Sequence, residues 1–131
     1  MGDQEIVQVS LGDRSYNIHI GRNIVEKTTL QLKALFNKSK VAVITDRNVF
    51  DNQYENLRNQ LSSLDLSIEL LVIEPGEKSK NWDSLQKILE WLIKKEIAKK
   101  DYIIAFGGGM IGDLVGLASS LLRRGVNLVQ I

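Results

Sequence analysis

Three consecutive glycines at positions 107–109 are the feature of this 131-residue sequence best suited to chemistry. They follow an apolar run and open a helical pattern, so the backbone can turn sharply and the N–H groups of the first helical turn point outward. Those donors and the helix dipole suit a pyrophosphate. A tight strand-to-helix turn without a ligand is the alternative. For Asp113, the alternatives are stabilisation of the helix dipole and contact with a ribose or nicotinamide.

A second candidate group is Thr-Asp-Arg-Asn at 45–48, directly after an apolar run. An acidic residue that leaves a strand, here Asp46, can accept hydrogen bonds from ribose hydroxyls in an NAD site. Taken alone, capping of the next helix or formation of a turn is the commoner role for Asp and Asn.

The loop 74–80 contains a Pro-Gly turn, and Ser79 is expected to cap a helix that begins near Asn81. Glu77 and Lys80 could face a nucleotide, although charged exposed loops are common. Further along, adjacent arginines at 123 and 124 end the helix that the glycines open. Cations there are favoured by the helix dipole, and a guanidinium also suits a phosphate or carboxylate.

The elements that must position these groups alternate between strands and helices. Apolar runs predict strands at 41–44, 68–73, 102–106 and 126–131, and helical spacing predicts helices at 24–36, 52–64, 81–97 and 109–122. This alternation predicts a Rossmann-like α/β domain with a mostly parallel sheet and helices on both faces. Two alternating runs, 6–11 and 15–20, predict a β-hairpin before it.

Two of the expected helices carry apolar stripes that should face the core. The stripe of helix 24–36 is Leu32, Leu35 and Phe36, and that of helix 81–97 is Trp82, Leu85, Ile88, Leu89 and Leu92. The last expected strand ends the chain without a covering helix. We therefore expect residues 1–131 to be one truncated domain.

Composition excludes several classes of protein. Seventeen basic and sixteen acidic residues argue against a nucleic-acid binder, and the absence of cysteine excludes disulfides and thiolate metal sites. No apolar run approaches the ~20 residues that span a bilayer. The polar, acidic N-terminus is unlike a secretory signal, so a cytoplasmic location is expected.

Together these stretches resemble the 3-dehydroquinate synthases. The strongest similarity is the run AFGGGMIGDLVG at 105–116, continuing through 118–120 to Arg-Gly-Val at 124–126, which matches that family's GGG-x-IGD-x-x-G…RG signature. The loop 74–80 is similar to the family's PGE-x-SK, and 45–49 to its nucleotide loop. The resemblance extends from the hairpin to the end of the chain.

The resemblance implies an NAD-dependent and metal-dependent lyase of the shikimate pathway, a homodimer at full length. The family converts 3-deoxy-D-arabino-heptulosonate 7-phosphate into 3-dehydroquinate and phosphate. Its Pro-Thr-Thr segment, its ligands for zinc or cobalt and its helical second domain would follow Ile131 and are missing here. We therefore expect the chain alone to be inactive, without certain catalytic or metal-binding residues, and to bind NAD weakly or not at all.

The resemblance also implies roles for individual residues. Gly108 and Gly109 would hold the pyrophosphate, and Asp113 would approach the nicotinamide. Arg124, which directly precedes a glycine and therefore ranks above Arg123, would bind the substrate phosphate in its own or a neighbouring subunit's site. The residues expected to grip the adenosine portion are Asp46, Asn48, Glu77 and Lys80.

Other functions stay open at this point. Sugar phosphate cyclases that make an inosose or valiolone, and polyol dehydrogenases of the glycerol or iron-dependent type, share a glycine-rich loop and a similar first domain. The IGD…RG run favours a 3-dehydroquinate synthase over the dehydrogenases and separates it less well from the other cyclases. A small non-enzymatic nucleotide-binding module is a further alternative.

Overall fold

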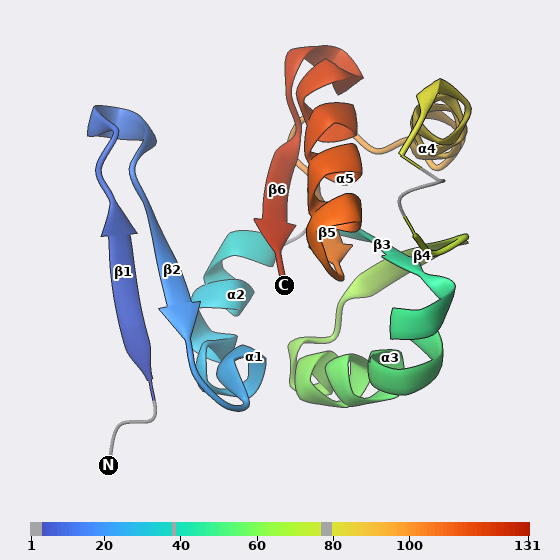
Figure 1. Ribbon diagram of the computed structural model, residues 1–131. Coiled ribbons are helices and arrows are strands. Elements are labelled where there is room, and N and C mark those ends of the chain that lie inside the picture. Colours follow the sequence, from blue (N-terminus) through green and yellow to red (C-terminus); the bar gives the residue numbers. More distant parts are fainter. Residues whose placement is uncertain (1–3, 38, 77–79) are drawn as a thin grey trace.

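Four apolar runs of the sequence form one parallel sheet in the computed structural model, which describes residues 4–37, 39–76 and 80–131 (Figure 1). The strands are β3 (Lys40–Asp46), β4 (Ser67–Ile73), β5 (Tyr102–Phe106) and β6 (Asn127–Gln130), in the order β4-β3-β5-β6. The central strands β3 and β5 are almost wholly buried, as expected for continuous apolar runs covered on both faces. The predicted fold class is confirmed.

Helices cover both faces of this sheet. One face packs against α1 (Ile24–Lys27), α2 (Thr29–Phe36) and α3 (Arg47–Leu61), and the other against α4 (Trp82–Lys94) and α5 (Gly109–Leu121). The described residues also form three short 3-10 turns: η1 (Gly12–Arg14), η2 (Ser62–Leu64) and η4 (Leu122–Arg124). Figure 1 shows α4 and α5 together on the side of the sheet opposite α3.

Alternate residues of the strands divide the core into two clusters. Ala42, Ile44, Ile103 and Ala105 point toward α4 and α5, whereas Val41, Val43 and Ile104 point toward α1, α2 and α3. The period of two along each strand produces this division. Residues of β3 and β5 belong to both clusters, so these two central strands are packed on both faces and provide a rigid support for side chains at their ends.

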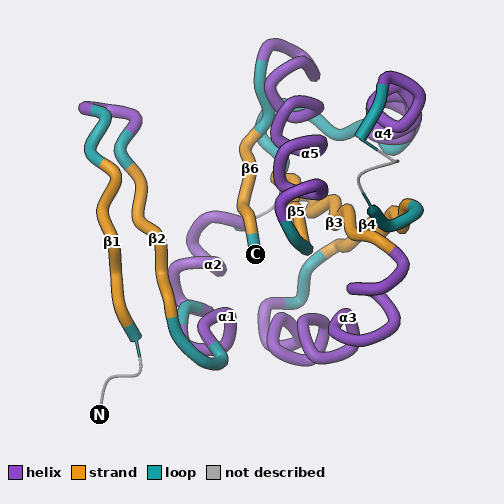
Figure 2. The backbone as a smooth tube through the Cα atoms, viewed as in Figure 1, coloured by secondary structure: helices purple, strands orange, loops and turns teal. Residues whose placement is uncertain are grey.

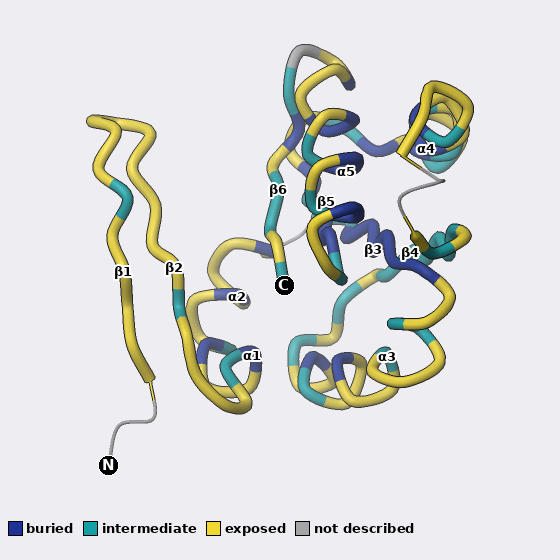
Figure 3. The backbone as a smooth tube through the Cα atoms, viewed as in Figure 1, coloured by how far each residue is buried: buried dark blue, intermediate teal, exposed yellow. Residues whose placement is uncertain are grey.

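An antiparallel hairpin stands beside the sheet without joining it. Its strands β1 (Glu5–Val9) and β2 (Tyr16–Ile20) pair in a register that places Val7 opposite Ile18. The predicted hairpin is confirmed, with each strand slightly shorter than expected. Most of its apolar side chains are exposed, and Figure 3 shows the exposure along nearly its whole length.

The predicted helix 24–36 is wrong in one respect, because two helices occupy its place. The chain leaves helical geometry at Thr28, with φ −106° and ψ 17°, and the Thr28 hydroxyl donates a hydrogen bond of 2.7 Å to the Ile24 carbonyl. A β-branched hydroxyl residue competes for backbone carbonyls in this way. The break rotates the second helix, so Leu32 and Phe36 are buried and Leu35 is exposed, against the predicted stripe.

The predicted helix 52–64 is also corrected, since α3 begins at Arg47 and ends at Leu61. The strand β3 therefore passes into α3 with no intervening loop (Figure 2). The helix α4 ends at Lys94, three residues earlier than expected. Trp82, the first residue of α4, is 78% exposed and is not part of the core stripe, against the prediction.

Within the described ranges, no helix has the length and apolar character needed to cross a membrane.

Candidate functional site

The strand order places a topological switch point at the carboxyl edge of the sheet, between β3 and β5. The chain moves from β3 to β4 on one side and then returns to β5 on the other side of β3. Connections therefore leave these two strands in opposite directions, onto α3 on one face and α5 on the other. In open parallel sheets, ligands bind at such a switch point, outside the carboxyl ends of the strands.

The first glycine of the corner, Gly107, has a structural requirement of its own. Its φ of +154° is rarely adopted by residues with side chains, and a Cβ there would lie 3.1 Å from Cγ1 of Ile111. The Gly107 N–H donates a hydrogen bond of 3.0 Å to the Ile131 carbonyl, which holds the corner against β6. Gly107 is thus explained by the strand-to-helix turn itself.

Gly108 and Gly109 have no comparable requirement. Both are exposed, neither has a positive φ, and a Cβ at either position would have no described atom within 4 Å. Gly108 is the N-cap of α5 and provides no side-chain cap. The N–H groups of the first helical turn have no acceptor within the helix, and the helix dipole favours an anion beside them. The missing side chains leave room for a group that approaches these amides closely, and a pyrophosphate fits that requirement.

Asp46 lies on the neighbouring strand, next to the glycine corner. Thr45 pairs with Phe106 in the β3–β5 register. Asp46 directly follows Thr45 and Gly107 directly follows Phe106, so the two residues leave neighbouring strands at the same level. The Val49 N–H donates a hydrogen bond of 2.8 Å to Oδ1 of Asp46, which makes Asp46 the N-cap of α3. The capping interpretation is therefore correct. Only one carboxylate oxygen is used in this bond, so the other can accept a bond from a ribose hydroxyl.

Two further residues expected at the nucleotide lie on the same edge. Asn48 is in the first turn of α3, where its side chain is exposed. Lys80, which precedes α4, forms an ion pair with Asp113 of α5, with 2.8 Å between Nζ and Oδ2. The ion pair joins two segments that are 33 residues apart in the sequence. The structure thus brings Asp46, Asn48, Lys80, Asp113 and the two unconstrained glycines to one edge.

Three other predicted residues have different outcomes. Glu77 lies outside the described residues, and so does the side chain of Arg124, whose backbone ends η4. Arg123 is described: its backbone has φ 47°, and its Nε donates a hydrogen bond of 3.1 Å to the Ile97 carbonyl. Arg123 is thus the structural arginine of the pair, holding η4 to the end of the segment that follows α4.

Sequence reasoning missed two residues that shape this edge. The buried Thr45 hydroxyl donates a hydrogen bond of 2.6 Å to the Phe106 carbonyl, which ties β3 to β5 at the switch point. Asn81, rather than Ser79, is the N-cap of α4, because its Oδ1 accepts a hydrogen bond of 2.9 Å from the Ser84 N–H. The Asn81-x-x-Ser84 spacing and the single hydroxyl in an apolar strand were the available signals.

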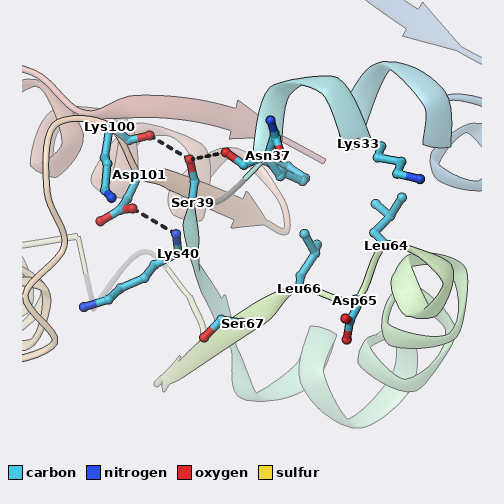
Figure 4. A pocket seen from close by; sticks show the side chains of 11 residues that line it. Lys33, Asn37, Ser39, Lys40, Leu64, Asp65, Leu66, Ser67, Lys100 and Asp101 are labelled. Atoms are coloured by element: carbon cyan, nitrogen blue, oxygen red, sulfur yellow. Dashed lines mark hydrogen bonds between the residues drawn. The ribbon is translucent and has the colours of Figure 1, made fainter.

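A cavity of about 510 Å³ lies at the opposite, amino edge of the sheet (Figure 4). Its lining residues include Lys33, Phe36, Leu64 and Lys100. The strands begin at this edge, so the cavity is separated from the switch point by the length of the sheet. In the part of the chain that the structure describes, no three His, Asp or Glu side chains are grouped closely enough to hold a metal ion.

Comparison with known proteins finds relatives of both the sequence and the fold. The family model described as "3-dehydroquinate synthase N-terminal" matches residues 70–131, which include the loop before α4 and the glycine corner. A 3-dehydroquinate synthase from Ruegeria pomeroyi is 39% identical over 125 residues, which cover 95% of this chain and 34% of that protein. The chain thus spans about a third of the length of the curated relatives that it matches.

Solved structures show the same fold. A 2-deoxy-scyllo-inosose synthase in complex with carbaglucose-6-phosphate, NAD⁺ and Co²⁺ matches with a TM-score of 0.84 and 23% identity, over 97% of this chain and 35% of that one. A 2-epi-5-epi-valiolone synthase from Streptomyces hygroscopicus, with NAD⁺ and Zn²⁺ bound, matches with a TM-score of 0.65 and 27% identity, over 70% of this chain and 26% of that one.

The first of these likenesses concerns the fold alone, whereas the matches to curated relatives concern the sequence over nearly the whole chain. The family match includes Lys80, Gly108, Gly109 and Asp113, all of which the structure places at the carboxyl edge. Over nearly its whole length, this chain is thus similar in sequence to proteins named 3-dehydroquinate synthase, and residues 70–131 match the N-terminal model of that family.

Proposed function

We propose that this chain supplies the NAD-binding part of a 3-dehydroquinate synthase. The whole enzyme would convert 3-deoxy-D-arabino-heptulosonate 7-phosphate into 3-dehydroquinate and phosphate, in the shikimate pathway. Sequence identity of 34–41% to proteins named 3-dehydroquinate synthase supports this substrate over those of other sugar phosphate cyclases. The fold is common to several cyclases and therefore does not choose among them.

The observation that carries the proposal is the difference among the glycines of the corner. Gly107 is needed for the turn, whereas the residues that the structure describes give no reason for glycine at 108 and 109. A bound diphosphate gives that reason, because it would occupy the space that two Cβ atoms would enter and would accept hydrogen bonds from the α5 amides.

The other residues of the edge would then hold the remainder of the dinucleotide. The second carboxylate oxygen of Asp46 would accept a bond from a ribose hydroxyl, and Asn48 would contact the adenosine portion. Asp113 would lie toward the nicotinamide, one turn into α5. When bound, NAD supplies the transient oxidation and re-reduction of a ring hydroxyl. In this proposal the chain binds and orients that cofactor.

The remaining roles come from the family resemblance. Arg124 would bind the substrate phosphate, and Glu77 would contact the adenosine portion. A divalent metal, zinc or cobalt, would be held by residues outside these 131. The full-length protein would act as a homodimer on its sugar phosphate, with neither nucleic acid nor membrane as a partner. Solved relatives with NAD⁺ and Co²⁺ or Zn²⁺ support the choice of cofactors.

The proposal is tested by adding one methyl group at different points of α5. We expect Gly108→Ala and Gly109→Ala to weaken ADP binding by roughly tenfold or more, because the methyl group takes the space of a phosphate oxygen and each tenfold loss corresponds to about 1.4 kcal/mol. Affinities would be measured on the isotope-labelled chain by NMR titration, which detects the weak binding expected here.

Gly116→Ala is the matched control, because it makes the same change in the same helix. A Cβ there would contact Gln130 and Leu128 at 3.9 Å, an ordinary van der Waals distance. We expect its ADP affinity to equal that of the parent chain. Equal affinities in all four proteins would contradict binding at the glycine corner.

A further inference from the structure

We propose that Thr45 is a positioning residue for the nucleotide, whose hydroxyl fixes the glycine corner, residues 107–109, relative to Asp46. The inference rests on the proposed function and deepens it. Asp46 and the amides of α5 would hold two different parts of one ligand, the ribose and the diphosphate. A ligand that spans both needs the correct distance and orientation between them. Thr45 connects the two strands at that point.

The hydroxyl of Thr45 is not required by packing. Thr45 is fully buried near the end of β3, and the four residues before it, 41–44, are buried apolar residues. A valine has the same branched shape and would bury no polar group there. The hydroxyl donates its hydrogen bond of 2.6 Å to the Phe106 carbonyl, on the neighbouring strand β5. The reason for the hydroxyl thus lies in what this bond holds.

The bond holds one side of the peptide group that precedes the glycine corner. The Phe106 carbonyl and the Gly107 N–H belong to the same planar peptide group. The carbonyl accepts the bond from Thr45, and the N–H donates to the Ile131 carbonyl at 3.0 Å. The peptide plane is therefore fixed from β3 on one side and from the residue after β6 on the other. This fixes the direction in which the chain enters Gly107.

Thr45 also links the glycine corner to the ribose side of the site. Asp46 directly follows Thr45, and its carboxylate is held by the hydrogen bond of 2.8 Å from the Val49 N–H. Thr45 and Phe106 form the last pair of the β3–β5 register. The hydroxyl bond thus joins the two strands where their pairing ends, between the residue that would hold the ribose and those that would hold the diphosphate.

Two substitutions separate the hydroxyl of Thr45 from the shape of its side chain. Thr45→Val keeps the branched shape and removes the hydroxyl, whereas Thr45→Ser keeps the hydroxyl and removes a methyl group. If the valine variant does not fold, Thr45→Ala removes the same hydroxyl and takes its place.

Thr28→Val is the matched control, because it removes another buried threonine hydroxyl that bonds to a backbone carbonyl. The Thr28 hydroxyl donates to the Ile24 carbonyl at 2.7 Å. Its surroundings are far from the glycine corner, since the nearby Glu26 N–H donates to Oε1 of Gln60, at the end of α3 opposite to Asp46.

The probes are ADP, which would span both halves of the site, and inorganic pyrophosphate, which would contact only the α5 amides. Dissociation constants would be measured by amide NMR titration. We expect Thr45→Val to bind ADP about three- to tenfold more weakly, the loss that corresponds to one hydrogen bond. Its pyrophosphate affinity should stay within about twofold of the parent, because the first amides of α5 keep their arrangement within the helix. Thr45→Ser and Thr28→Val should bind both probes as the parent chain does.

The other outcomes separate the two proposals. If Thr45→Val weakens both probes equally, the hydroxyl supports the amides themselves, and the inference is overturned while the proposed function stands. An unchanged ADP affinity in Thr45→Val, or a loss of the same size in Thr45→Ser, also overturns the inference alone. If neither probe at millimolar concentration shifts an α5 amide of the parent chain, the proposed function fails, and the inference fails with it.

Discussion

The two edges of the parallel sheet differ in what their polar groups bond to. At the amino edge, where the cavity lies, the carboxylate of Asp101 is 1% exposed and accepts hydrogen bonds from the Lys40 and Ala98 N–H groups, at 2.9 and 2.7 Å. The Ser39 hydroxyl donates to the Lys100 carbonyl at 3.0 Å (Figure 4). At the carboxyl edge, the amides that open α5 have no side-chain cap among the described residues.

The helix ends show the same difference. The last turn of α4, at the amino edge, is closed by hydrogen bonds from Glu96 N–H to Ile93 and from Ile97 N–H to Leu92, and the Lys40 ammonium donates to the Lys95 carbonyl. The start of α5 is left open. The polar groups named at the amino edge are already bonded within the protein, whereas the first amides of α5 have no side-chain cap among the described residues and are better placed to bind a ligand.

The largest expected effect concerns the amino edge. Asp101→Ala should lower the free energy of unfolding by about 3 kcal/mol, because two backbone N–H groups lose a charged acceptor. Urea unfolding measures the loss. ADP binding under folding conditions should stay unchanged, and a weakened ADP affinity would show that the two edges are not independent.

A second comparison concerns the stability that is lost when Gly107 or Gly108 is replaced by alanine. Gly107→Ala should cost about 2 kcal/mol of stability, because it combines an unfavourable φ with a 3.1 Å contact to Ile111. Gly108→Ala should cost no more than about 0.5 kcal/mol, as for an exposed site without strain. Urea unfolding of both variants checks the difference. Equal losses would mean that Gly108, too, is a structural glycine.

Two substitutions at Asp46 test its role as the N-cap of α3. Asp46→Ala should cost about 1 kcal/mol, since α3 loses its N-cap, whereas Asp46→Asn should keep the cap and most of the stability. Thermal or urea unfolding measures both. If Asp46→Asn destabilises as much as Asp46→Ala, the bond to the Val49 N–H is not what the carboxylate contributes.

The smallest expected effect is a gain at the closed end of α4. Glu96 has φ 57° and follows the C-cap Lys95, a position that favours glycine. Glu96→Gly should raise the free energy of unfolding by about 0.5 kcal/mol, because the strain of a left-handed residue is removed. A loss of stability in the same unfolding assay would show that the Glu96 side chain has a stabilising contact there.

Much of the fold could be predicted from local patterns. The strand 102–106 is observed at Tyr102–Phe106, and the predicted parallel sheet and hairpin are present. The errors occur where the hydrogen bond of a single polar side chain determines where a helix begins or breaks. Thr28 bonds to the preceding turn and breaks a helix, and Asp46 caps a helix that starts five residues earlier than expected. Periodicity reports burial of apolar faces and is insensitive to such bonds.

The sequence selects candidate residues for the site but not their arrangement. It names the glycines, Asp46, Asn48, Lys80 and Asp113 as candidates for cofactor binding, and the structure brings them to one edge of the sheet. The Lys80–Asp113 pair and the closeness of Gly107 to Ile111 were not predicted, because the first joins the loop before α4 to the distant helix α5 and the second depends on the angle of the turn. The alternation of strands and helices predicts the order of the elements but does not specify ion pairs or close contacts between individual residues.

The central claim is that the open amides of α5 bind a diphosphate. The most direct measurement is a titration of the isotope-labelled chain with ADP, and in parallel with adenosine, followed by amide NMR. We expect ADP to shift the amide signals of Gly108, Gly109 and Met110 most strongly, and adenosine to leave them nearly unchanged. Shifts confined to residues around the amino-edge cavity, or equal shifts with adenosine, would contradict the claim.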